Sequence, residues 1–406
     1  MVTISAIVIS LIVITIMLLA IKFNSIFRNP RIKIHKENRP LANEAFRIIH
    51  TGFVDRLEVS FVKNSELYAS EDHFVYKSSD MGMTFRCLGH FNKVNPSFIE
   101  IIKDKIARSR IVRLLRRTRD TTNIVVLNSG TIIIIYDHIY RSDDNGKSLH
   151  PVFTVPKEYY GPLTHGYTIC KNGNIYFGEY NCNKRPHIIK VLKGSDDGRN
   201  WSVCFTFEKG KIFHIHSITY DEFRDRLWIC TGDRDNESYL FYTDNDFKNL
   251  SLLGGGDQDW RICSLIITKD FLYWCSDNDV SGSSICRWSF ENRLREKLIF
   301  IGKPSYHSTC LKDGTLVFST TYEPDSQYTK KFAPKPSTEI WISKNGLDWF
   351  KIIDLDYKES VTPYGKSRPQ IVFPAGDHSA THLFFTPWHT TMDNFSIQRY
   401  FIEWKY

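Results

Sequence analysis

A strand–turn–strand pattern that recurs about every 50 residues is the feature that most constrains the fold of this chain. In each copy, two segments rich in β-branched and aromatic residues flank a short turn, usually with Asn, Asp or Gly, which is the pattern of an antiparallel hairpin. Five copies lie at 123–136, 167–179, 217–232, 262–277 and 308–322. The chain is 42% hydrophobic and 24% charged, as expected of a globular protein whose sheets bury a large core. Antiparallel sheet is therefore expected along most of its length.

A sharper hairpin motif accompanies the repeats. It is S-S-D-M-G-M-T-F at 78–85, S-D-D-N-G-K-S-L at 142–149 and G-S-D-D-G-R-N-W at 194–201. Weaker copies lie at 243–250 and 342–349, and in the last copy Lys344 is expected at the position of the Asp. Successive copies begin 64, 52, 49 and 99 residues apart, and the last interval is close to two units.

These hairpins resemble the Asp-box, or BNR, repeat of sialidase-like β-propellers. The resemblance implies that Asp80, Asp144 and Asp196 stabilise the hairpin turns by accepting backbone N–H bonds, and are not catalytic. The sialidase motif Phe/Tyr-Arg-Ile-Pro has its nearest match at 27–30, before the repeats begin. The resemblance therefore implies a propeller without a recognisable sialidase active-site motif.

The number of units predicts the architecture. A degenerate hairpin near 291–293 fills the longest interval, and a final unit spans 368–404, which makes seven units. We therefore predict an all-β, seven-bladed β-propeller over residues 53–406, with a basic insertion at about 98–119. Residues 23–52 are predicted to form a basic linker, in which residues 45–51 could supply the outer strand that closes the last blade.

The N-terminus predicts a membrane anchor. Residues 2–21 carry no charge and are mostly Ile, Val and Leu. About 20 such residues can cross a bilayer as a helix, so residues 1–22 are predicted to form a transmembrane anchor. Residues 22–39 then carry six Lys or Arg against one Glu. Positive flanks stay on the cytoplasmic side, so we expect a single-pass membrane protein with a cytoplasmic propeller.

A second basic segment, residues 103–119, carries eight Lys or Arg against one Asp. It could contact anionic lipids beside the anchor, or it could be a solvated insertion. It contains no aromatic residue, so nucleic acid is not an expected partner. The net charge is +8, and the two basic segments together exceed this value, so the rest of the chain is slightly acidic.

Strand direction predicts where a functional site would lie. The first strand of a blade lines the central channel, so the starts of first strands and the ends of second strands share one face. The Asp-box turns lie on the opposite face. Residues with suitable chemistry occur at or near the predicted face. The candidate catalytic residues are His165, Glu179, His216, Asp233 and His307, and the candidate substrate-binding residues are Arg119, Arg261, Asp277, Tyr322 and Arg368.

These candidates suggest an enzyme that acts on an acidic carbohydrate. A lyase, by analogy with propeller-type polysaccharide lyases, would use Arg261 or Arg368 to neutralise a carboxylate and His216 or His165 as the base. A glycosidase would instead use the carboxylate pair Glu179 and Asp233. No cofactor and no metal site are predicted, although His165, His216 and His307 could bind a metal ion if they converged. The alternative is a non-catalytic propeller that binds a glycan or a partner in a membrane complex.

Overall fold

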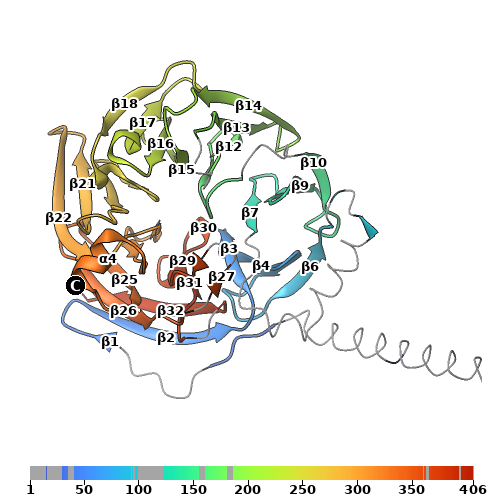
Figure 1. The fold of residues 1–406 in the computed structure, drawn as a ribbon. Helices are drawn as coiled ribbons and strands as arrows, with labels where there is room; N and C mark the ends of the chain where they lie inside the picture. The colour runs from blue at the N-terminus through green and yellow to red at the C-terminus, as the bar shows by residue number, and fades with distance from the viewer. Residues whose placement is uncertain are drawn as a thin grey trace, which may run out of the picture.

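The computed structural model describes residues 30–34, 41–92, 94, 97–98, 122–154, 161–180, 186–359, 361–362, 365–392 and 395–405, together with Thr15. Seven sheets are arranged in a ring (Figure 1), and all their strand pairs are antiparallel except that of the short β30 (Ala375–Gly376) with β3 (Glu58–Lys63) in the first blade. The predicted all-β, seven-bladed propeller is therefore confirmed. The degenerate unit near 291–293 and the final unit each form a blade.

The first four blades each contain four strands, which follow one another from the channel outward. Blade 1 contains β3 (Glu58–Lys63), β4 (Glu66–Glu71), β5 (Phe74–Ser78) and β6 (Arg86–His90). Blade 2 contains β7 (Asn123–Val126), β8 (Ile132–Ile135), β9 (Ile139–Ser142) and β10 (His150–Phe153). Blade 3 contains β11 (Tyr167–Ile169), β12 (Ile175–Gly178), β13 (Ile189–Ser195) and β14 (Asn200–Phe207). Blade 4 contains β15 (His214–Asp221), β16 (Arg226–Gly232), β17 (Tyr239–Thr243) and β18 (Ser251–Gly255).

The remaining blades follow the same order. Blade 5 contains β19 (Ile266–Ile267), β20 (Phe271–Cys275), β21 (Ser283–Ser289) and β22 (Leu294–Gly302). Blade 6 contains β23 (His307–Cys310), β24 (Leu316–Ser319), β25 (Ser337–Ser343) and β26 (Phe350–Asp356). Blade 7 contains β29 (Gln370–Val372), β31 (His382–Trp388), β32 (Ile397–Trp404) and β2 (Phe46–Val54), with β1 (Leu41–Ala42) at its edge. The short elements are β27 (Val361–Thr362), β28 (Gly365–Lys366), β30 (Ala375–Gly376), η1 (Asp235–Glu237), η2 (Gln258–Trp260) and α4 (Gln327–Phe332).

The inner and outer strands differ in burial because of their place in the ring. Both β7 and β8 are buried along their whole length, and β8 is four consecutive isoleucines. Such a strand is covered on both faces by neighbouring blades, so an unbroken apolar run suits it. The outer strand β14 has mostly exposed or half-buried side chains. The core is therefore formed between the inner halves of the blades.

The ring is closed by an N-terminal strand. Strand β2 pairs antiparallel with β32 from Phe46 opposite Trp404 to Val54 opposite Ile397, which confirms the closing strand expected at 45–51. The predicted propeller boundary at residue 53 is wrong, because it falls inside β2. The predicted linker also includes a packed piece, since the amide of Phe85 donates to the carbonyl of Pro30 at 2.9 Å.

The hairpin motif forms a hydrogen-bonded turn. Asp80 accepts from the amide of Thr84 at 2.9 Å and from its hydroxyl at 2.6 Å. In the copy at 342–349 the expected alignment is wrong by one residue. Asn345, not Lys344, accepts from the turn amides, while the Lys344 ammonium pairs with Asp313 at 2.7 Å. An amide oxygen can take the place of the carboxylate in this turn, whereas an ammonium group cannot accept hydrogen bonds.

Two predictions lie outside the described residues. They are the membrane anchor at 1–22, of which only Thr15 is described, and the basic run at 103–119 with Arg119. Within the described ranges, no helix combines the length and the apolar character needed to cross a membrane.

Candidate functional site

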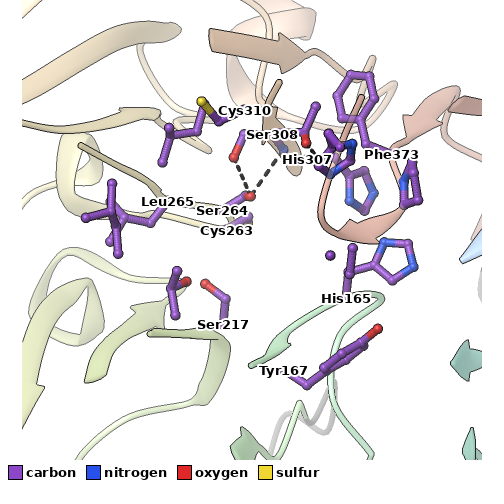
Figure 2. Close-up of a pocket in the computed structure, with 18 of the residues that line it drawn as sticks. His165, Tyr167, Ser217, Cys263, Ser264, Leu265, His307, Ser308, Cys310 and Phe373 are labelled. Carbon is purple, nitrogen blue, oxygen red and sulfur yellow. Dashed lines mark hydrogen bonds between the residues drawn. The ribbon is translucent and has the colours of Figure 1, made fainter. Parts of the chain in front are cut away.

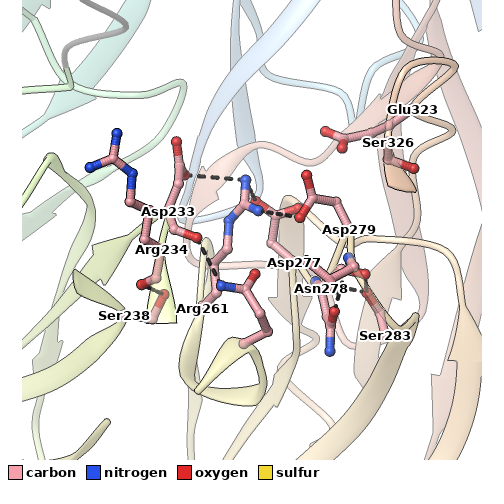
Figure 3. Close-up of polar contacts among 12 residues, drawn as sticks. Asp233, Arg234, Ser238, Arg261, Asp277, Asn278, Asp279, Ser283, Glu323 and Ser326 are labelled. Atoms are coloured by element: carbon pink, nitrogen blue, oxygen red, sulfur yellow. Dashed lines mark hydrogen bonds and ion pairs between the residues drawn. The ribbon is translucent and has the colours of Figure 1, made fainter. Parts of the chain in front are cut away.

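The predicted face of the channel carries a dense polar cluster between blades 4 and 5. His214 and His216 lie at the start of β15, and Asp233 follows β16 directly. Arg261 precedes β19, and Asp277 follows β20. Because His214 pairs with Gly232 in the sheet, the start of β15 and the end of β16 meet at one edge. Figure 3 shows Asp233, Arg261, Asp277 and Asp279 converging there.

Arg261 is surrounded by carboxylates. Its Nη2 lies 3.2 Å from Asp233 Oδ1 and 3.0 Å from Asp277 Oδ2, and its Nη1 lies 2.9 Å from Asp279 Oδ1. The side chain is 10% exposed. A guanidinium that already contacts three carboxylates has little capacity left for an anionic ligand. The predicted role of Arg261 as the group that holds a ligand carboxylate is therefore disfavoured by its surroundings.

His216 is also fully engaged. Its Nδ1 lies 3.1 Å from the carbonyl oxygen of Ile262, and its Nε2 lies 2.9 Å from His214 Nε2 and 3.3 Å from Asp233 Oδ1. Burial lowers the pKa of His216 to about 4, so the ring is neutral near pH 7. Neither nitrogen faces open space, which does not suit the predicted role of general base.

The two buried carboxyl groups of this cluster respond differently to their surroundings. Burial alone would raise the pKa of Asp233, but its contacts with His214 and His216 and the charge of Arg261 lower it. Burial holds the pKa of Asp277 well above its ordinary value, despite the neighbouring Arg261. The Cys263 thiol donates to Asp277 Oδ2 at 3.5 Å. The surroundings thus favour ionisation of Asp233, whereas burial opposes ionisation of Asp277.

A second polar group lies at blade 6. Arg368 Nη1 is 2.7 Å from Glu323 Oε1 and donates to the Tyr306 hydroxyl at 2.6 Å. That hydroxyl in turn donates to Glu323. The Arg368 side chain is 48% exposed, whereas Glu323 is 4% exposed. Of the two predicted arginines that the structure describes, Arg368 is thus the more accessible.

The channel contains a cavity of about 400 Å³ (Figure 2). Its lining includes His165, His307 and His378, with Cys263 and Tyr306 connecting it to the two polar groups. Burial lowers the pKa of His165 to about 3 and those of His307 and His378 to about 4. These three imidazoles are therefore neutral near pH 7.

Each channel histidine has a different environment. His307 Nε2 lies 3.2 Å from Gln370 Oε1, and His378 Nε2 lies 2.6 Å from the Thr309 hydroxyl. His165 Nε2 is buried and has no hydrogen-bond partner among the described residues. His165 is accordingly the channel imidazole with a free ring nitrogen.

The remaining predicted residues are Glu179, Tyr322 and Arg119, and the Glu179 carbonyl accepts from the amide of Ile215 at 3.0 Å beside the histidine pair. Glu179 accepts from the amide of Lys190 at 2.8 Å within blade 3 and is 1% exposed. The Tyr322 ring packs against Tyr357 with centroids 5.8 Å apart. Arg119 is not among the described residues. Of the predicted glycosidase pair, Glu179 therefore accepts a hydrogen bond within blade 3, and Asp233 contacts His214, His216 and Arg261.

Among the residues of these clusters that were not predicted are Tyr306, Asp279 and His378. Tyr306 directly precedes the predicted His307, so the start of a first strand was its available signal. Asp279 lies two residues beyond Asp277, in the loop after β20. His378 lies in an irregular segment after β30, where the repeat gives no alignment. Loop residues such as these carry no periodic signal.

Comparison with known proteins supports the fold alone. No family model matches the chain, and no curated protein matches it in sequence. An oligogalacturonate lyase in complex with manganese is 10% identical, with a TM-score of 0.55 over 93% of this chain and 97% of the lyase. The oligogalacturonate lyase of Vibrio parahaemolyticus is also 10% identical, with a TM-score of 0.58 over 92% of this chain and 97% of that one. These solved structures share the propeller architecture.

Proposed function

We propose that the protein binds an acidic carbohydrate at this mouth of the channel and cleaves it by elimination beside a uronate carboxylate. The observation that carries the proposal is Arg368, a half-exposed guanidinium whose partner Tyr306 lines the channel cavity. A guanidinium binds a carboxylate in a planar, two-pronged geometry. The cavity of about 400 Å³ is within the size range of ligand pockets. The architectural likeness to two oligogalacturonate lyases is compatible with this substrate class.

The proposed chemistry uses three groups of this chain. Arg368 binds the carboxylate and stabilises the negative charge that develops on it. His165 Nε2 accepts the proton from the carbon next to the carboxylate, and the electron pair of that C–H bond forms a C=C bond. The glycosidic C–O bond breaks, and its electron pair goes to the leaving oxygen, which takes a proton from Tyr306. Burial raises the pKa of Tyr306 well above its ordinary value, so its proton is present at neutral pH.

The low pKa of His165 describes the ring in a cavity that holds no substrate. With no anion nearby, a pKa of about 3 makes the imidazole a weak base. A substrate carboxylate in the same cavity would favour the protonated ring and raise this pKa. The base would therefore become stronger when substrate binds.

The test uses the full chain and a panel of uronate oligosaccharides. Ultraviolet absorbance of the unsaturated product and the number of new reducing ends are both followed. We expect both signals from at least one substrate, and a loss of about 100-fold or more in kcat/KM for His165→Ala and Arg368→Ala. His382→Ala serves as a control, because His382 lies on β31 beside Arg399 and Phe384, outside the cavity lining.

Other outcomes would replace the proposal. New reducing ends without the unsaturated product would assign a glycosidase. Folded His165→Ala and Arg368→Ala proteins with full activity would place the chemistry elsewhere. Binding of the oligosaccharides without cleavage would favour the non-catalytic propeller.

From the sequence we also propose that the protein is related to Asp-box propellers and that it is anchored in a membrane. The apolar segment 2–21 and the basic residues after it motivate a single-pass anchor with a cytoplasmic propeller. Protease protection in sealed vesicles tests the orientation. Cleavage of the propeller from the cytoplasmic side supports it, and protection from that side contradicts it.

A further inference from the structure

Three side-chain atoms converge at the junction of β15 and β16. His214 Nε2, His216 Nε2 and Asp233 Oδ1 are separated by 2.9, 3.2 and 3.3 Å. The two imidazoles are 1% exposed, whereas the Asp233 side chain is 33% exposed. The three atoms therefore face one small point that solvent can reach past Asp233.

The hydrogen-bond roles at this point present the lone pair of His216 Nε2 and an oxygen of Asp233 to the same place. The carbonyl of Ile262 can only accept, so His216 Nδ1 carries a proton and donates to it at 3.1 Å. In the neutral ring, His216 Nε2 is then a lone pair. It faces Asp233 Oδ1, a second acceptor, at 3.3 Å. Arg261 Nη2 also donates to Asp233 Oδ1 at 3.2 Å, so one proton on His214 Nε2, shared with His216 Nε2, holds the three atoms together.

The spacing of the three atoms matches that of ligands around one divalent metal ion, which would take the place of the shared proton. Imidazole nitrogens and carboxylate oxygens bind zinc at about 2.0–2.2 Å, so the ligands of a tetrahedral ion lie about 3.3 Å apart. The three observed separations are at or slightly below this value. Small side-chain adjustments would therefore admit an ion, and three protein ligands would leave a position for water or substrate.

The surrounding groups suit a metal site. The hydrogen bond from His216 Nδ1 to a backbone carbonyl is the usual device that orients a metal-binding imidazole. The Tyr180 ring packs over His214, with centroids 4.2 Å apart. Arg261 brings one positive charge, but it contacts three carboxyl groups, Asp233, Asp277 and Asp279. The neighbourhood is therefore not cationic, even when Asp277 is protonated.

We propose that His214, His216 and Asp233 bind one divalent transition-metal ion. Two imidazoles and one carboxylate favour Zn²⁺, Co²⁺, Fe²⁺ or Mn²⁺ over Ca²⁺ or Mg²⁺, which prefer oxygen ligands. Cys263 and Asp277 also lie close enough to His216 to act as additional ligands. This proposal goes beyond the proposed lyase activity and does not rest on it, because metal binding is measured without substrate.

The test is metal titration of the full chain after removal of metals with a chelator. Co²⁺ binding is followed by its visible absorption, and Zn²⁺ binding by calorimetry. We expect one ion per chain and a higher melting temperature with metal. His216→Ala and Asp233→Asn should each weaken binding about 100-fold or more. Asp233→Asn preserves the side-chain shape, so it supports the test if His216→Ala does not fold.

The matched control is His307→Ala, which removes a buried channel histidine outside the trio. This protein should keep wild-type affinity. The proposal is overturned if the wild type binds neither metal, or if Asp233→Asn binds as tightly as the wild type. It is equally overturned if His307→Ala abolishes binding while Asp233→Asn does not, because the ion would then lie in the channel cavity.

Discussion

Arg261 and Arg368 carry the same side chain at the same mouth of the channel, but their surroundings give them different roles. Arg261 is 10% exposed and contacts three carboxyl groups, so its charge is used within the protein. Arg368 is 48% exposed and contacts one carboxylate. At the scale of single residues, exposure and partners therefore decide which cation can recognise a ligand, whereas residue type does not.

Arg261→Ala should destabilise the protein by about 3–5 kcal/mol, because it leaves the buried Asp277 and the partly buried Asp233 and Asp279 without their cation. Urea unfolding measures the loss. Arg199→Ala is the control, since Arg199 is 52% exposed and its carboxylate partners lie 3.9 Å away. It should change stability by less than about 1 kcal/mol. Equal stability of the two variants would contradict a structural role for Arg261.

At the scale of elements, each blade separates the hairpin turn from the chemistry. The turn of Asp80 lies between the third and fourth strands of blade 1, at the opposite end of the blade from the starts of first strands. Asn345 performs the same hydrogen-bonding role in blade 6. The hairpin motif thus stabilises the opposite ends of the blades, and it does not constrain which residues lie at the channel face.

Asp80→Ala should lower stability by about 1–2 kcal/mol, because the Thr84 amide and hydroxyl lose their acceptor. Thermal unfolding measures the change. Asp80→Asn is the matched variant, and it should lose less because it keeps one acceptor oxygen. Neither variant should alter cleavage of the uronate substrate, and a loss of activity in the folded proteins would place Asp80 in the site.

At the scale of the whole molecule, the N-terminal strand holds the ring closed. Phe46, Ile48 and Val54 of β2 are 2%, 3% and 1% exposed, and each contributes about 1.5–3 kcal/mol by burial. Together with the backbone bonds to β32, this is comparable to the total stability of a typical domain. The last blade therefore depends on residues that are far away in the sequence.

A chain that begins at residue 55 should fail to unfold cooperatively, because blade 7 lacks its fourth strand. A chain that begins at residue 30 keeps β1 and β2 and should melt like the full chain. Calorimetry compares the two. A sharp transition at the full-chain melting temperature in the shorter protein would show that closure by β2 is dispensable.

The buried channel histidines should make the molecule acid-sensitive. His165, His307 and His378 have pKa values of about 3 to 4 in the folded state, below the ordinary value of 6.5. Above a pH of about 6.5 the three imidazoles are neutral in the folded and the unfolded state, so they do not make the free energy of unfolding depend on pH. As the pH falls, only the unfolded chain takes up these protons, so each histidine costs about 1.4 kcal/mol per pH unit until its folded pKa is reached.

Urea midpoints between pH 7 and pH 5 measure this loss. Asp277 acts in the opposite direction, because its raised pKa favours the folded state at lower pH, but it is one group against three. His307→Gln should reduce by about one the number of protons that the chain takes up on unfolding at low pH. A midpoint that does not fall with pH would contradict burial of neutral imidazoles in the channel.

The sequence by itself determined the blade repeat, the number of blades and the position of the closing strand, and it predicted a shared face for His165, His216, Asp233, Arg261 and His307. These follow from strand periodicity and chain direction, which are local properties that repeat along the chain. Only the tertiary structure decided which of these residues contact one another. The packing of blade 5 against blade 4 brings Arg261 among three carboxyl groups, the loop after β16 sets Asp233 against His214 and His216, and Arg368 is left half exposed. These contacts depend on irregular loops and on how neighbouring blades pack, which no local pattern encodes.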